Sequence, residues 1–116
     1  MQQRASVLYE RNNKANAYLT KEIMDASQEK LLLKVYDFAI VNCQRGDIEK
    51  TNKAITQLIN ALNFDDEKAR EISTGLFRLY QFAQDMMRKG RHEVTLKILS
   101  DLREVWVIVF NKNMRQ

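Results

Sequence analysis

The stretch VTLKILSDLREVWVIVF, residues 94–110, is the most apolar part of the chain and determines how the rest of it can fold. At ~100° per residue, its apolar side chains cover an arc wider than the ~100° that an ordinary core-facing helix needs. A helix this apolar has to be covered on two sides, by its own bundle or by a partner. Its narrow face carries Val94, Ile98, Leu102, Val105 and Val109, and the side chains of Leu99, Trp106 and Phe110 extend that face sideways.

The same stretch predicts which residues seal a bundle and which are left over. We expect the narrow face from Ile98 to Val109 to close the core, with Trp106 wedged beside it. Three further apolar residues fall outside this arc, and their covering is unexplained: Leu96, Val107 and Ile108.

Composition favours a single all-α domain. The chain has 116 residues, of which 45% are hydrophobic and 29% charged, so it can bury a core but is too short for two comfortable domains. It contains no proline and three glycines, and residues with high helix propensity dominate. Residues 105–110, VWVIVF, also have strand propensity, but no other segment offers a strand for pairing.

Apolar periodicity and capping residues predict the helices. After a flexible arm over residues 1–12, a short helix covers residues 13–24, and Ser27 caps a second helix over residues 28–44 that Gly46 ends. Asp47 caps a third helix, residues 63–66 form a turn, and a fourth helix covers residues 67–88. Gly75 within this fourth helix suggests that another helix passes close to it.

Short connections make sequential helices antiparallel neighbours. We therefore expect an antiparallel up-down four-helix bundle with a short additional N-terminal helix, in which residues 13–116 form a single domain.

The sequence offers no constellation for catalysis, a metal or a cofactor. Its one cysteine, Cys43, lies on an apolar helical face, which predicts a buried structural thiol. A catalytic cysteine would need a histidine nearby, and the sequence has one histidine, His92. The acids at residues 65–67 lack calcium-loop spacing and are typical of a helix cap. We expect no enzyme activity and no cofactor.

The chain shows no feature of a membrane or nucleic-acid protein. No apolar run reaches the roughly 20 residues that span a bilayer, and residues 1–14 lack the core of a signal peptide, which favours the cytoplasm. The net charge is +4, but basic and acidic residues are interleaved, and no recognition motif is present. Function is therefore expected to be the binding of a protein partner, for which Met-rich and aromatic grooves suit amphipathic helices.

Several motifs resemble those of a known family. Its opening Asn-Pro-Tyr-x-Ala-Tyr is matched by Asn13, Ala17 and Tyr18, its Thr-Ala-Ser/Thr-Pro helix start by residues 25–28, and its Leu-Tyr-Asp by Tyr36, Asp37 and the nearby Ala39. Its Glu-Ile-x-x-x-Leu-x-x-Leu-Tyr is matched by Glu71, Ile72, Leu76, Leu79 and Tyr80, and its Leu-Arg-Glu-Ala-Trp by residues 102–106. In this order, from residue 13 to residue 110, the chain resembles the flagellin-specific export chaperones of bacterial flagella, the FliS family.

The chain also departs from the pattern of that family. Both motif prolines and the first motif tyrosine are replaced, by Lys14, Gln28 and Ala15, and the segments between residues 36 and 64 and between residues 80 and 106 are shorter than in the family. The resemblance is thus to a shortened or divergent member.

The resemblance implies a cytoplasmic chaperone that binds the disordered C-terminal segment of flagellin along an apolar surface of the bundle. Such a chaperone prevents premature polymerisation and delivers its client to the flagellar export apparatus. The alternatives are a helical adaptor or co-chaperone for a different amphipathic helix, or a bundle that forms a homodimer through its last helix. The candidate partner-binding residues are Tyr18, Ile23, Tyr36, Leu79, Tyr80, Leu96, Val107 and Ile108.

Overall fold

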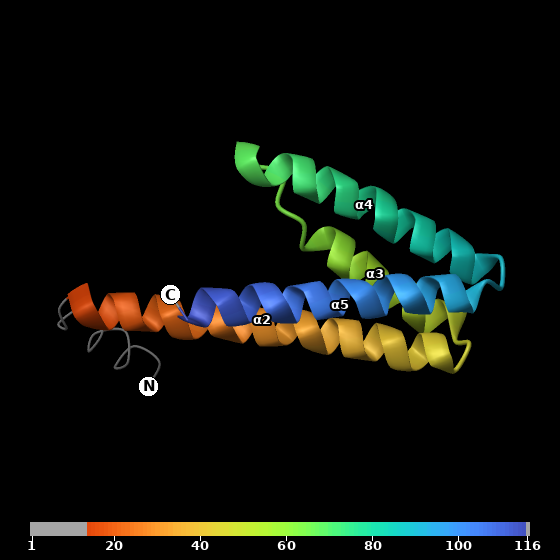
Figure 1. Cartoon of the computed structure of the whole chain (residues 1–116), viewed down its shortest axis with the longest axis horizontal. Coiled ribbons are helices and arrows are strands. Elements are labelled where there is room, and N and C mark those ends of the chain that lie inside the picture. Colours follow the sequence, from red (N-terminus) through yellow and green to blue (C-terminus); the bar gives the residue numbers. More distant parts are fainter. Residues whose placement is uncertain (1–13, 116) are drawn as a thin grey trace, which may run out of the picture. The chain divides into compact units, whose positions relative to one another are not determined.

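The computed structural model describes the backbone of residues 14–115 and, within that range, the side chains of residue 25 and of residues 27–112. These residues form four helices, α2 (Lys14–Gln44), α3 (Ile48–Asn60), α4 (Glu67–Arg88) and α5 (His92–Arg115), and no strand (Figure 1). The all-α four-helix bundle expected from the sequence is confirmed. The predicted arm, residues 1–12, lies outside the described residues.

The chain divides into two compact units, Met1–Leu31 and Leu32–Gln116. The described part of the first unit is the N-terminal portion of α2. The second unit contains the rest of α2 together with α3, α4 and α5, and its consecutive helices run in opposite directions (Figure 1). A single domain over residues 13–116 stays a prediction.

Helix α2 is continuous through Ser27, so the predicted boundary between a short first helix and a second helix is wrong. Serine is a favourable N-cap where a helix begins, but it is also tolerated inside a helix. Here Gln28, a good helix former, stands where the family motif has proline, and no glycine interrupts the segment. Nothing in the local sequence stops the hydrogen-bond ladder.

Glycines and a capping aspartate lie at the turns between the helices. Gly46 and Gly90 adopt the left-handed region, with φ of 72° and 76°, after the C-terminal ends of α2 and α4. The Asp47 side chain accepts a hydrogen bond from the Lys50 amide at 3.0 Å and caps α3. Gly75 differs from expectation, because a Cβ placed there meets nothing within 4 Å, and no other helix of the described part of the chain passes close to it.

The core of the second unit draws on all of its helices. Its buried apolar residues are Tyr36, Ala39 and Cys43 of α2, Ala54, Ile55 and Leu58 of α3, Tyr80, Ala83 and Met87 of α4, and Leu99 of α5. The burial of the Cys43 thiol confirms that prediction, and burial also raises its pKa.

Helix α5 is rotated relative to the orientation expected from its apolar stripe. Leu99 is fully buried, whereas Val105 and Val109 are 53% and 37% exposed, so the prediction that these two valines seal the core is wrong. The reason is Thr95, which is also fully buried and donates a hydrogen bond from Oγ1 to the Ala83 carbonyl at 2.7 Å. A satisfied threonine occupies the core face, and the apolar stripe shifts accordingly. The shift also packs Leu96 against the core, contrary to expectation.

Candidate partner-binding surface

Three aromatic side chains form a hydrogen-bonded network inside the second unit. The Tyr36 hydroxyl, from α2, hydrogen-bonds the Tyr80 hydroxyl of α4 and accepts a hydrogen bond from Trp106 Nε1 of α5 at 3.0 Å. The tyrosines are 0% and 1% exposed. Burial raises the pKa of both phenols above their ordinary value, so they stay neutral hydrogen-bonding groups. The network joins three helices.

An ion pair reinforces the same junction nearer the surface. Arg103 Nε of α5 lies 2.6 Å from Asp37 Oδ1 of α2, and its Nη2 lies 3.4 Å from Oδ2. Tyr36, Asp37, Tyr80, Arg103 and Trp106 all belong to the motifs that carry the family resemblance. These motif residues thus hold the helices together, and the two tyrosines leave almost no side-chain surface for a partner.

The eight predicted partner-binding residues lie in very different environments. The side chains of Tyr18 and Ile23 are outside the described residues. Tyr36 and Tyr80 are buried in the network, and Leu79, Leu96 and Val107 are half-buried. Only Ile108, which is 53% exposed, presents a largely free apolar side chain among the six that are described.

Ile108 belongs to a continuous exposed stripe on α5. Val105, Ile108 and Val109 are 53%, 53% and 37% exposed, and their i, i+3, i+4 spacing places them on one face of the helix. We call these three residues the α5 stripe. An apolar stripe of this spacing is the surface that a second helix packs against.

Further exposed apolar residues were missed by the sequence analysis. On α2, Phe38 and Val41 are 51% and 42% exposed, and on α4, Ile72 and Phe82 are 65% and 48% exposed. A signal existed for Phe38, because it follows the buried Tyr36 by two positions and therefore lies about 200° away around the helix. Apolar residues on opposite sides of one helix indicate that one of them is exposed or covered by a partner.

A groove lies between α2 and α3. It has a volume of about 280 Å³ and is lined by Val35, Phe38, Ala54 and Gln57 together with Lys34, Lys50 and Lys53. Its floor is apolar and its rim is basic. The groove is formed entirely by the second unit.

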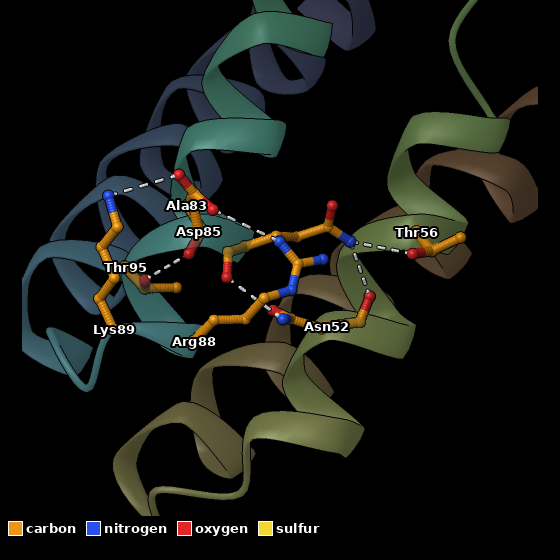
Figure 2. Close-up of polar contacts among 8 residues, drawn as sticks. Asn52, Thr56, Ala83, Asp85, Arg88, Lys89 and Thr95 are labelled. Atoms are coloured by element: carbon orange, nitrogen blue, oxygen red, sulfur yellow. Dashed lines mark hydrogen bonds and ion pairs between the residues drawn. The ribbon is translucent and has the colours of Figure 1, made fainter.

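A second hollow, between α3 and α4, is polar. Figure 2 shows Asn52 and Thr56 of α3 facing α4. The Gln84 side chain donates from Nε2 to the Asn52 carbonyl at 3.0 Å and to Thr56 Oγ1 at 2.9 Å, and Asn52 Nδ2 donates to the Gln84 carbonyl at 3.2 Å (Figure 2). At the end of α4, Asp85 pairs with Arg88 and Lys89. Most of these groups pair with one another, while Asn52 Oδ1 is buried without a hydrogen-bond partner. The polar side chains that line this hollow make it a poor site for an apolar helix.

The chain was compared with known proteins. The model of one protein family, described as flagellar protein FliS, matches residues 11–113. The chain belongs to the FliS family. No curated protein and no solved structure matches the chain.

Membership in the FliS family bears on the exposed apolar residues of the bundle. The family is one of flagellar chaperones, whose work is to bind a protein. The described residues of this FliS-family chain contain no group of His, Cys, Asp and Glu side chains that could hold a metal ion. None of the described helices has the length and apolar character to cross a membrane. Among the described residues, the α5 stripe and the α2–α3 groove present apolar surface to solvent.

Proposed function

We propose that the chain is a cytoplasmic export chaperone that binds the disordered C-terminal segment of flagellin. In this proposal the segment forms helices along exposed apolar surface of the bundle, which prevents premature polymerisation. The complex then passes its client to the flagellar type III export apparatus. The proposal rests on membership in the FliS family and on one structural observation, the α5 stripe.

The α5 stripe suits such a client for a physical reason. A disordered segment loses conformational entropy when it folds on a surface, so the surface must return that free energy through apolar contact. Each largely exposed valine or isoleucine that becomes covered contributes about 1 kcal/mol or more at ~25 cal/mol per Å². Val105, Ile108 and Val109 lie along successive turns and can engage one face of a client helix.

Co-elution tests the proposal. The purified protein is mixed with its cognate flagellin, and separately with flagellin that lacks the C-terminal segment, before size-exclusion chromatography. We expect a complex with the first only. If full-length flagellin does not co-elute, the proposed function is wrong, and equal binding of the truncated client would show that the C-terminal segment is not the part recognised.

A variant of the stripe tests the surface itself. Val105→Ser/Ile108→Ser/Val109→Ser should weaken flagellin binding by tenfold or more, on the order of 1.4 kcal/mol per factor of ten. Ile72→Ser, at an apolar residue of α4 that is 65% exposed, is the matched control and should bind like the wild type. Equal losses in both variants would show that the α5 stripe is not the docking surface. A concentration-dependent dimer of the free protein that the stripe variant abolishes would instead assign the stripe to a second copy of the chain.

A further inference from the structure

The α2–α3 groove combines two properties that the proposed function does not use. Its floor contains the ring of Phe38, which is 51% exposed, and the half-buried Val35 lines the groove as well. Leaving half of a phenylalanine in water is costly, since apolar burial is worth about 25 cal/mol per Å². The groove therefore gains free energy from any apolar side chain that enters it.

The rim of the groove is positively charged on both sides. Lys34 lies on α2, and Lys50 and Lys53 lie on α3, all of them exposed. No Asp or Glu from the described part of the chain lines the groove. One rim lysine has an acidic neighbour on its own helix: the Glu49 carboxylate is 3.4 Å from the Lys53 ammonium, with both side chains at least 74% exposed. A pair so exposed is weak and can exchange for a partner's carboxylate.

The shape of the groove indicates the form of its occupant. On α3 the lining runs from Lys50 to Gln57, which is about two helical turns, or ~10 Å. A third helix packs well into the space between two antiparallel helices, with its apolar side chains entering between theirs. The flanks of that helix would face Lys34 on one side and Lys50 and Lys53 on the other.

We propose that the α2–α3 groove binds an acidic amphipathic helix of the client, about two to three turns long, with an apolar stripe on Phe38 and carboxylates facing the three lysines. This inference rests on the proposed function and adds to it the chemistry of one client segment. The lysines select for acidic segments and raise the association rate, and the apolar floor supplies most of the affinity.

The test measures binding of a fluorescent C-terminal segment of the cognate flagellin by anisotropy, at ionic strengths of about 0.02 and 0.15 M. The rim variant is Lys34→Glu/Lys50→Glu/Lys53→Glu. It should weaken binding roughly tenfold or more at the lower ionic strength and by less at the higher one, because exposed charges are screened by salt. Phe38→Ser should weaken binding by a similar factor at both ionic strengths.

A matched control separates local charge from net charge. Lys68→Glu/Arg78→Glu/Lys112→Glu changes the net charge by the same amount at exposed residues of α4 and α5 that do not line the groove. This control should bind like the wild type. Circular dichroism of every variant verifies that the helices are retained.

Each result has a defined meaning. If the wild type does not bind the segment, the proposed function fails and this inference fails with it. If the wild type and the rim variant bind equally, or the charge control loses as much as the rim variant, the inference fails while the proposed function stands. A client segment with its Asp and Glu replaced by Lys should bind the rim variant better than the wild type, and the absence of that reversal would also overturn the inference. If the rim lysines are needed for binding vesicles of anionic phospholipid, and not for binding the client, the groove faces a lipid surface instead.

Discussion

Removing the hydroxyl of Tyr36 should destabilise the protein more than removing that of Tyr80. Both hydroxyls are buried, but Tyr36 has two partners, the Tyr80 hydroxyl and Trp106 Nε1, whereas Tyr80 has only Tyr36 among the described hydrogen bonds. Tyr36→Phe therefore leaves two polar groups without their partner. Tyr80→Phe leaves the Tyr36 hydroxyl with the Trp106 donor still in place.

The magnitudes follow from the burial of each group. A hydrogen bond contributes about 1 kcal/mol net, and leaving a buried polar group unpaired costs about 1–3 kcal/mol. After Tyr36→Phe the hydroxyl of Tyr80, a residue that is 1% exposed, loses its hydrogen bond to Tyr36, while Trp106 is only half-buried and its indole can reach water. We expect a loss of about 2–4 kcal/mol for Tyr36→Phe and about 1–2 kcal/mol for Tyr80→Phe.

Urea denaturation followed by circular dichroism measures both losses and their coupling. The double variant removes both hydroxyls, so no tyrosine hydroxyl is left unpaired, and its loss should be smaller than the sum of the single losses by about 1 kcal/mol. Equal losses for the two single variants, or additivity within about 0.5 kcal/mol, would refute the network as the structure describes it.

Three further outcomes are expected. The two phenols should leave the free energy of unfolding unchanged below about pH 10 and lower it above that pH. The reason is that burial raises the pKa of Tyr36 and Tyr80, so the unfolded chain loses these protons at a lower pH than the folded chain does. Urea melts at rising pH measure this fall, which should be smaller in the double Phe variant. Gly75→Ala should raise the free energy of unfolding by about 0.5–1 kcal/mol, since the site is helical and empty; a destabilisation would show that another element does pass close. Leu99→Ala should cost about 2–5 kcal/mol and Val105→Ala less than about 0.5 kcal/mol in chemical denaturation, and the reverse order would restore the orientation of α5 expected from its apolar stripe.

Features encoded by a single residue could be predicted from the sequence. Gly46 and Asp47 end one helix and begin the next as expected, since a left-handed residue and a capping carboxylate act locally. The number of helices in the second unit followed from the same signals. The helix break expected at Ser27 was wrong, because serine is a possible N-cap but no proline or glycine beside it interrupts the helix.

Features that depend on the packing of two helices could not be predicted. The orientation of α5 depends on Thr95, whose hydroxyl is satisfied by the Ala83 carbonyl of α4, and no sequence pattern reveals that partner. Treating threonine as polar rotated the predicted core face and placed Val105 and Val109 inside. The α2–α3 groove was missed for a related reason, because its lysines come from two helices and no single segment is strongly basic.

The hydrogen-bonded motif residues and the exposed apolar residues have different effects on the protein, which bears on how one scaffold could serve different clients. The motif residues Tyr36, Tyr80 and Trp106 are joined to one another, so their substitution is expected to change stability before it changes recognition. Phe38 and the α5 stripe are exposed and make no hydrogen bond that fixes their identity, so they can vary at little cost to the fold. On the proposed function, the matched motif residues specify a bundle that can hold a helix. The choice of client then resides in exposed apolar and basic residues that match no motif, among them Val105, which stands where the motif has alanine.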